Sequence, residues 1–132
     1  MALEDVRTYL PGELMQKLQS LIETAHQLRA PGGCAWDAEQ THRSLIQYLL
    51  EETYELIEAI ESGSREEVIE ELGDVLYQVI FHSDLGSTGT FGEPFDIEDV
   101  AQFMEQKMRS RHPHVFGTEE EQQRIKAQTG DE

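Results

Sequence analysis

The stretch from Ser64 to His82 constrains the fold more than any other part of the sequence. Its apolar residues recur at steps of three and four around most of a helical circumference: Val68, Ile69, Leu72, Val75, Leu76, Val79 and Ile80. It opens with Ser-Arg-Glu-Glu at 64–67, the S-x-x-E spacing of a capping box, in which each side chain accepts a hydrogen bond from the other residue's backbone amide. The sequence therefore predicts a helix that begins at Ser64 and is buried on several sides.

Three other segments have the periodicity of amphipathic helices. They run over about 12–28, from 41 or 44 to 62, and over about 97–110. Gly63 directly follows the second segment, where glycine commonly ends a helix, and Asp96 precedes the third as an N-cap. Because only Gly63 separates two long helices, we expect those helices to form an antiparallel hairpin.

No segment has the convincing period-two alternation of a strand. The stretches around 30–40 and 86–94 are rich in Gly and Pro and are expected to be loops. The polar tail, 118–132, either is disordered or forms a terminal helix around 122–127. The sequence therefore predicts an all-α fold, a bundle of four helices.

Length and charge limit the classes of function. With 132 residues, the chain is expected to be a single domain over 1–132, with a core at about 12–117. Lys and Arg number 10 against 27 Asp and Glu, and the net charge of −17 argues against binding to nucleic acid or to an anionic membrane. A phosphate ligand would need metal cations between it and the protein. The lone Cys34, and an N-terminus without a secretory pattern, predict a cytoplasmic protein.

Four acidic residues are spaced so that they meet across the predicted hairpin. Glu52 and Glu55 are three residues apart, as are Glu71 and Asp74, so each pair projects from one side of its helix. The two pairs lie at similar distances from the turn at Gly63. The hairpin therefore brings them face to face.

Such a group of carboxylates favours a bound cation. Unpaired charges are costly to bury, and like charges raise one another's pKa, whereas Mg²⁺ prefers carboxylate oxygens and leaves positions open for water and phosphate. The alternative is a solvated acidic face. Glu71 and Asp74 argue against it because they interrupt an otherwise apolar helix, so at least one of them must point toward packed surface.

Four stretches of the sequence resemble a known family. They are LRAPGGCAWDAEQT (28–41), YLLEETYELIEAI (48–60), EELGDVLYQVIFH (70–82) and KMRSRHPHVFG (107–117). EExxE followed by ExxD across a helical hairpin is the signature of the all-α nucleoside triphosphate pyrophosphohydrolases. The chain is most similar to the MazG domains of that superfamily.

The resemblance implies hydrolysis of nucleoside triphosphates to the monophosphate and pyrophosphate, with Mg²⁺, for which Mn²⁺ can substitute. The implied substrates include noncanonical or damaged nucleotides, a housecleaning role. The family's metal ligands fall on the four acids named above, with Glu52 and Glu55 also counted as catalytic. Glu51, the first acid of EExxE, is the candidate to position or deprotonate the attacking water.

Further residues are implied to bind the substrate. The resemblance assigns phosphate contacts to Lys107 and Arg111, which Arg109 can join; the alternative is that these basic residues only complement the dipole at the end of their helix. Tyr48 lies in a segment that the family uses around the nucleotide. Trp36 either stacks on a base or caps the hydrophobic core.

Other expectations concern assembly and activity. The resemblance implies a MazG-type four-helix bundle. One hairpin with two flanking helices covers its core poorly, so we expect the bundle to be completed by homo-oligomerisation, as a homodimer or a dimer of dimers. Ala35 and Ala38 stand where the family commonly has Pro and Lys, which removes a possible phosphate or base contact. The alternative function is a noncatalytic helical module that binds nucleotides or a partner protein.

Overall fold

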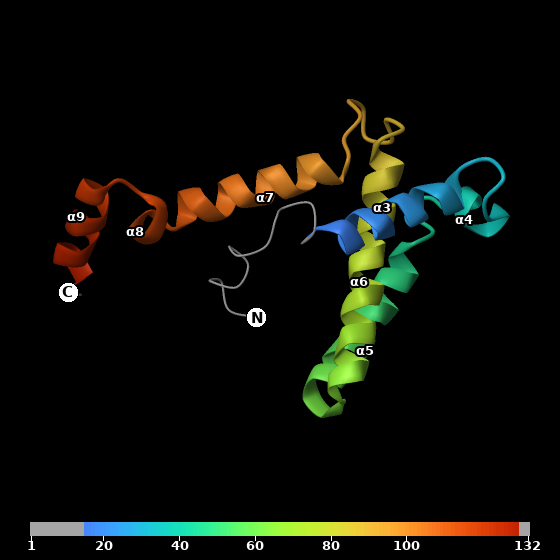
Figure 1. Ribbon diagram of the computed structural model, residues 1–132, viewed down its shortest axis with the longest axis horizontal. Coiled ribbons are helices and arrows are strands. Elements are labelled where there is room, and N and C mark those ends of the chain that lie inside the picture. The colour runs from blue at the N-terminus through green and yellow to red at the C-terminus, as the bar shows by residue number, and fades with distance from the viewer. Residues whose placement is uncertain (1–14, 130–132) are drawn as a thin grey trace.

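The computed structural model describes residues 15–129, a part of the chain that consists of helices joined by turns and loops (Figure 1). The helices are α3 (Gln16–Arg29), α4 (Ala35–Glu39), α5 (Ile46–Ser62), α6 (Arg65–Gly86), α7 (Ile97–Arg111), α8 (Pro113–Phe116) and α9 (Glu119–Thr129). No strand occurs between residues 15 and 129, so the all-α prediction is confirmed. The first three residues of the helix predicted at 12–28 lie outside the described residues, and residues 119–129 of the polar tail form α9.

The antiparallel hairpin of α5 and α6 is the centre of the fold. Gly63 ends α5 as predicted, and its backbone amide donates a hydrogen bond to the carbonyl of Ala59 at 2.8 Å. A Cβ atom at position 63 would lie 2.7 Å from that carbonyl oxygen, which is too close for any side chain. The turn is therefore tight, and only two residues, Gly63 and Ser64, lie between the end of α5 and the start of α6.

The predicted capping box at Ser64 is only half formed. Ser64 Oγ accepts a hydrogen bond from the Glu67 amide at 3.2 Å, as expected of an N-cap. The Glu67 carboxylate, however, turns to the Ser64 hydroxyl at 3.4 Å instead of the Ser64 amide. At the start of α7 the box is complete, because Asp96 and Asp99 each accept a hydrogen bond from the other's backbone amide.

Helix α3 packs against α6 through an ion-pair cluster. Asp84 on α6 accepts hydrogen bonds from Arg29 and from His26 Nδ1, the second at 2.8 Å. The Arg29 guanidinium also lies over the ring of Phe81, 5.4 Å from its centroid. Phe81 belongs to the small buried core with Leu45 and Leu85. The start of α5, the C-terminal half of α6 and α3 are thereby fixed to one another.

The C-terminal helices leave the hairpin. Figure 1 shows α7 running away from α5 and α6, with α8 and α9 at its far end. Large apolar side chains remain exposed on this arm, among them Phe103 and Met104 at 68% and 48% exposure. The four predicted helices therefore do not close into one bundle within a single chain. No helix in the range 15–129 has both the length and the apolar character needed to cross a membrane.

Candidate metal centre and the adjoining cavity

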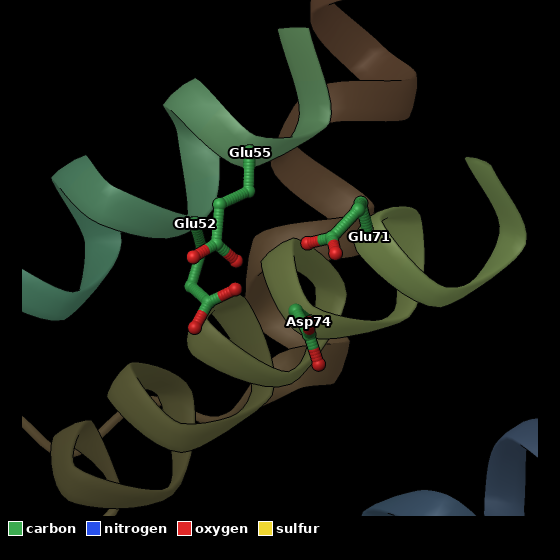
Figure 2. A group of neighbouring side chains, drawn as sticks. All are labelled: Glu52, Glu55, Glu71 and Asp74. Atoms are coloured by element: carbon green, nitrogen blue, oxygen red, sulfur yellow. The ribbon is translucent and has the colours of Figure 1, made fainter. Parts of the chain in front are cut away.

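The two acidic pairs meet between α5 and α6. Figure 2 shows Glu52 and Glu55 on one helix and Glu71 and Asp74 on the other, with their carboxyl groups between them. One carboxylate oxygen from each residue lies within 4.8 Å of the other three. The proximity that the hairpin predicted is therefore confirmed.

Burial differs among the four acids. Glu52, Glu71 and Asp74 are half-buried, whereas Glu55 is exposed. Desolvation, and then the charges of Asp74 and Glu55, raise the pKa of Glu52 from 4.5 to about 7. Desolvation, followed by the charges of Glu55 and Asp74, also raises the pKa of Glu71. Without a cation, the group therefore holds protons that ordinary surface carboxylates would have lost.

The donor set fits a hard divalent cation. Glu52 Oε2 and Glu71 Oε2 are both buried and have no hydrogen-bond partner among the described residues. A buried acceptor without a partner costs about 1–3 kcal/mol, and more when it is charged. Four carboxylate groups without nitrogen or sulfur ligands suit Mg²⁺ or Mn²⁺. A bound cation would satisfy these oxygens and remove the repulsion that raises the two pKa values.

A cavity of about 260 Å³ opens beside the acidic group. Glu52 and Asp74 form part of its wall, so the carboxylates face into it. Its remaining lining residues are mostly aromatic or apolar: Trp36, Asp37, Leu45, Tyr48, Tyr77, Gln78 and Phe81. The rings of Trp36 and Tyr48 meet edge to face, with centroids 5.7 Å apart. Trp36 and Tyr48, which the sequence predicted as substrate-binding residues, therefore both line the cavity next to the acids.

Glu51 lies outside the acidic group. Its side chain is exposed on α5 and accepts a hydrogen bond from Gln47 Nε2 at 3.1 Å. Because Glu51 and Glu52 are adjacent on a helix, their side chains point in directions about 100° apart. Glu51 is thus not one of the four converging carboxylates.

The predicted phosphate-binding residues lie on α7, away from the acids of the same chain. Figure 1 shows the C-terminal half of α7, which carries Lys107, Arg109 and Arg111, well removed from the hairpin. Arg109 makes a weak ion pair with Glu105 at 3.9 Å and lies 4.6 Å from the centroid of the Phe116 ring. One chain alone therefore does not bring its basic residues to its acidic group.

Sequence reasoning missed five residues that line the cavity: Asp37, Leu45, Tyr77, Gln78 and Phe81. Of these, Gln78 could have been found from the sequence. The available signal was its spacing, because Gln78 follows Asp74 by one helical turn. His82 lies one turn further along, and its Nδ1 is within hydrogen-bond distance, 2.8 Å, of His42 Nδ1.

Comparison with known proteins gives one consistent result. The profile of the MazG nucleotide pyrophosphohydrolase domain matches residues 40–116, more than half of the chain. The nucleoside triphosphate pyrophosphohydrolase/pyrophosphatase MazG of Thermotoga maritima is 49% identical over 106 residues, which are 80% of this chain and 39% of that protein. The nucleoside triphosphate pyrophosphohydrolase of Escherichia coli K12 is 38% identical over 103 residues, 77% of this chain and 38% of that protein.

A further relative carries no functional name. The uncharacterized protein YabN of Bacillus subtilis is 51% identical over 103 residues, 78% of this chain and 20% of that protein. The chain thus spans well under half the length of the curated relatives it matches. The likeness is to one domain of longer proteins.

Proposed function

The chain belongs to the MazG nucleotide pyrophosphohydrolase family, and on that basis we propose that it hydrolyses nucleoside triphosphates to the monophosphate and pyrophosphate. The observation that carries the proposal is the convergence of four carboxylates beside an aromatic cavity. The names of the relatives from Thermotoga maritima and Escherichia coli support this class of reaction.

We propose that Glu52, Glu55, Glu71 and Asp74 hold Mg²⁺, with Mn²⁺ as a substitute. When bound, the cation supplies charge neutralisation for the triphosphate and acidifies coordinated water. The protein's own contribution is to fix these acids on two rigid helices, so that little reorganisation is needed when the substrate arrives.

In the proposed reaction, a water oxygen forms a bond to the α-phosphorus while the bond from that phosphorus to the bridging oxygen breaks. Pyrophosphate leaves with the electron pair, and the water proton passes to a carboxylate oxygen of the protein. We assign this proton to Glu51, whose exposed side chain is next in sequence to Glu52 of the acidic group. Glu51→Gln should therefore lower kcat while leaving the affinity for Mn²⁺ unchanged.

The cavity is the proposed position of the nucleoside. The ring of Trp36 or of Tyr48 offers a face on which a base can stack, and the acids that would hold the metal form the adjacent wall. An aromatic wall accepts any base, so noncanonical and damaged nucleotides are proposed among the substrates, in a housecleaning role. A cytoplasmic location is proposed because the lone Cys34 cannot form an internal disulfide.

We also propose that the active form is a homodimer or a dimer of dimers whose sites are completed between chains. Two observations support this assembly: large apolar side chains remain exposed on α5, α6 and α7, and the basic residues of α7 lie far from the acids of their own chain. In such an assembly, Lys107, Arg109 and Arg111 of a second copy would supply the positive charge that the acidic site lacks.

The principal test is product analysis with purified protein, Mg²⁺ and a panel of standard and damaged nucleoside triphosphates. Pyrophosphate and monophosphate as the first products are expected. Orthophosphate as the first product would overturn the assignment. Nucleotide binding without any turnover would instead indicate a noncatalytic module.

Mixing two variants tests completion of the site by a second copy. Asp74→Asn and Arg111→Gln should each be inactive alone, because each removes a different half of every site. In an equimolar mixture, a mixed dimer has one site free of both substitutions, so about a quarter of wild-type activity should return. No recovery after subunit exchange, verified by native mass spectrometry, would contradict the shared site.

A further inference from the structure

Buried polar atoms without a partner gather on one face of α6. Among the described residues there are five such side-chain atoms, and three of them belong to Glu71, Gln78 and His82 of α6. Glu52 contributes a fourth from across the hairpin, and Arg29 the fifth. Glu71, Asp74, Gln78 and His82 follow one another at steps of three and four, so they form a polar stripe along the helix. This stripe begins at the acidic group and continues past it.

Gln78 lies on this stripe immediately beyond the acids. It follows Asp74 by four residues, about one helical turn or 5.4 Å along the axis. Its Oε1 atom is fully buried and accepts no hydrogen bond from the described residues. Gln78 also lines the aromatic cavity together with Asp74 and Tyr77. A polar group without a partner is therefore held in the wall of an otherwise largely aromatic pocket.

An unpartnered carboxamide in this position requires an explanation. Burying an amide without a hydrogen bond costs about 1–3 kcal/mol, and buried polar groups in proteins are almost always paired. The unpaired oxygens of Glu52 and Glu71 are explained by a cation. A cation held by the four acids does not explain Gln78, because its carboxamide lies a full turn further along α6. Turning the amide over exchanges its oxygen and nitrogen, so the side chain can present either an acceptor or donors at the cavity wall.

We propose that Gln78 is a specificity-determining residue that hydrogen-bonds the edge of the substrate's nucleobase. The inference rests on the proposed function, because that function places a nucleoside triphosphate with its phosphates at the acids. From there the sugar and base extend into the cavity, where the ring of Trp36 or of Tyr48 contacts a flat face of the base. Gln78 contacts its edge, where donors and acceptors differ from one base to another.

The test is the ratio of kcat/KM between the preferred triphosphate and those with other bases. Gln78→Leu removes the hydrogen-bonding groups at nearly constant size and should reduce this ratio by about tenfold or more. The affinity for Mn²⁺, measured by electron paramagnetic resonance, should stay unchanged. The matched control is Gln123→Leu, the same substitution at an exposed position on α9, which should leave the ratio unaltered.

Several results would overturn the assignment of Gln78. A Gln78→Leu variant with equal losses for every base has lost structure and not recognition. An unchanged ratio, or equal kcat/KM for all bases in the wild-type protein, would also contradict it. If Gln78→Leu does not fold, as judged by circular dichroism, Gln78→Glu keeps the size, removes the donors when ionised and should change the ratio.

Failure of the proposed function has a different signature. In that case the wild-type protein releases no pyrophosphate from any triphosphate. Specificity is then measured as the ratio of dissociation constants between triphosphates with different bases. Calorimetry gives these constants for the wild-type and Gln78→Leu proteins. A ratio that Gln78→Leu does not alter, or no binding at all, would overturn the role of Gln78.

Discussion

The carboxyl groups of Glu52 on α5 and Asp74 on α6 lie within 4.8 Å of each other across the helical hairpin. The two residues approach from opposite helices and share the wall of the cavity with Tyr48 and Tyr77. Their repulsion is one cause of the raised pKa of Glu52. Any ligand that joins the two helices at this point must therefore be positively charged.

Neutralising one acid of the group should abolish the proposed activity without unfolding the chain. For Asp74→Asn or Glu55→Gln we expect kcat/KM to fall by at least about 100-fold, because a metal ligand is lost while repulsion among the remaining acids declines. The control is Glu58→Gln, an exposed acid on α5 outside the group, which should retain activity. Full activity in either site variant, with native circular dichroism, would refute the assignment of ligands.

Metal binding should depend on pH through Glu52. Its pKa of about 7 in the metal-free protein, caused first by desolvation and then by Asp74 and Glu55, means that Mg²⁺ must displace a proton near neutral pH. Affinity should therefore increase from pH 6 to pH 8. Calorimetry in buffers of different ionisation enthalpy would measure the released proton, and Glu52→Gln should reduce that release. A pH-independent affinity would contradict the raised pKa.

The same group should make the metal-free protein less stable as the pH rises. The pKa of Glu52 is about 7 in the folded protein and 4.5 in the unfolded chain, so as the pH rises the unfolded chain loses the Glu52 proton first. The protonated Glu52 side chain therefore contributes fully to folding stability below pH 4.5, and this contribution is lost as the pH rises to about 7. In EDTA, the Tm of the wild-type protein should therefore fall relative to that of Glu52→Gln as the pH rises. Mg²⁺ should reverse it at pH 8. A difference that stays constant from pH 5 to pH 8 would be the contrary result.

His82 should act on stability in the opposite direction. Burial, and then the neighbouring His42, lower the pKa of His82 below 6.5, so the unfolded chain takes up a proton first on acidification. The neutral His82 imidazole therefore contributes fully to folding stability above pH 6.5. This contribution is lost as the pH falls through the pKa that His82 has in the folded protein. Urea titrations of wild type and His82→Gln from pH 5 to pH 8 would measure it. His114→Gln, at an exposed position, serves as control and should leave the pH dependence intact.

Removing Asp84 should loosen α3 from α6. The Asp84 and Arg29 side chains are only 16% and 12% exposed, so Asp84→Ala leaves a guanidinium largely buried without its partner. We expect a loss of about 3 kcal/mol in the free energy of unfolding. Glu66→Gln breaks the surface pair with Arg65, whose side chains are 77% and 80% exposed, and should cost about 0.5 kcal/mol. Equal losses in the two variants would contradict a structural role for Asp84.

The hairpin and its acids could be predicted because their signals are local. Helical periodicity, the glycine at position 63 and the cap at Ser64 determine where two helices end and begin, and the spacing of the acids then determines that they meet. The half-formed capping box did not affect this result. One hydrogen bond from the Glu67 amide was enough to begin α6 at the predicted residue.

The walls of the cavity and the direction of α7 could not be predicted in this way. Asp37 lies on α4, which has five residues, too few for periodicity to reveal which side it buries. The course of α7 is determined by the connection from Ser87 to Phe95, where Gly89 and Gly92 adopt φ of 86° and 99°. Glycine permits such values but does not specify them, so the sequence contains no signal for the direction in which the chain leaves α6.

The tight turn at Gly63 makes the length of the chain between α5 and α6 part of the site. An additional residue that extended α6 at its start would rotate all later side chains by about 100° and turn Glu71 and Asp74 away from α5. A loop lengthened without extending either helix would leave the pairs free to slide past each other. Natural variants of this domain should therefore tolerate insertions in the connection after Gly86 and exclude them at positions 63 and 64, even though both connections lie far from the carboxylates in sequence.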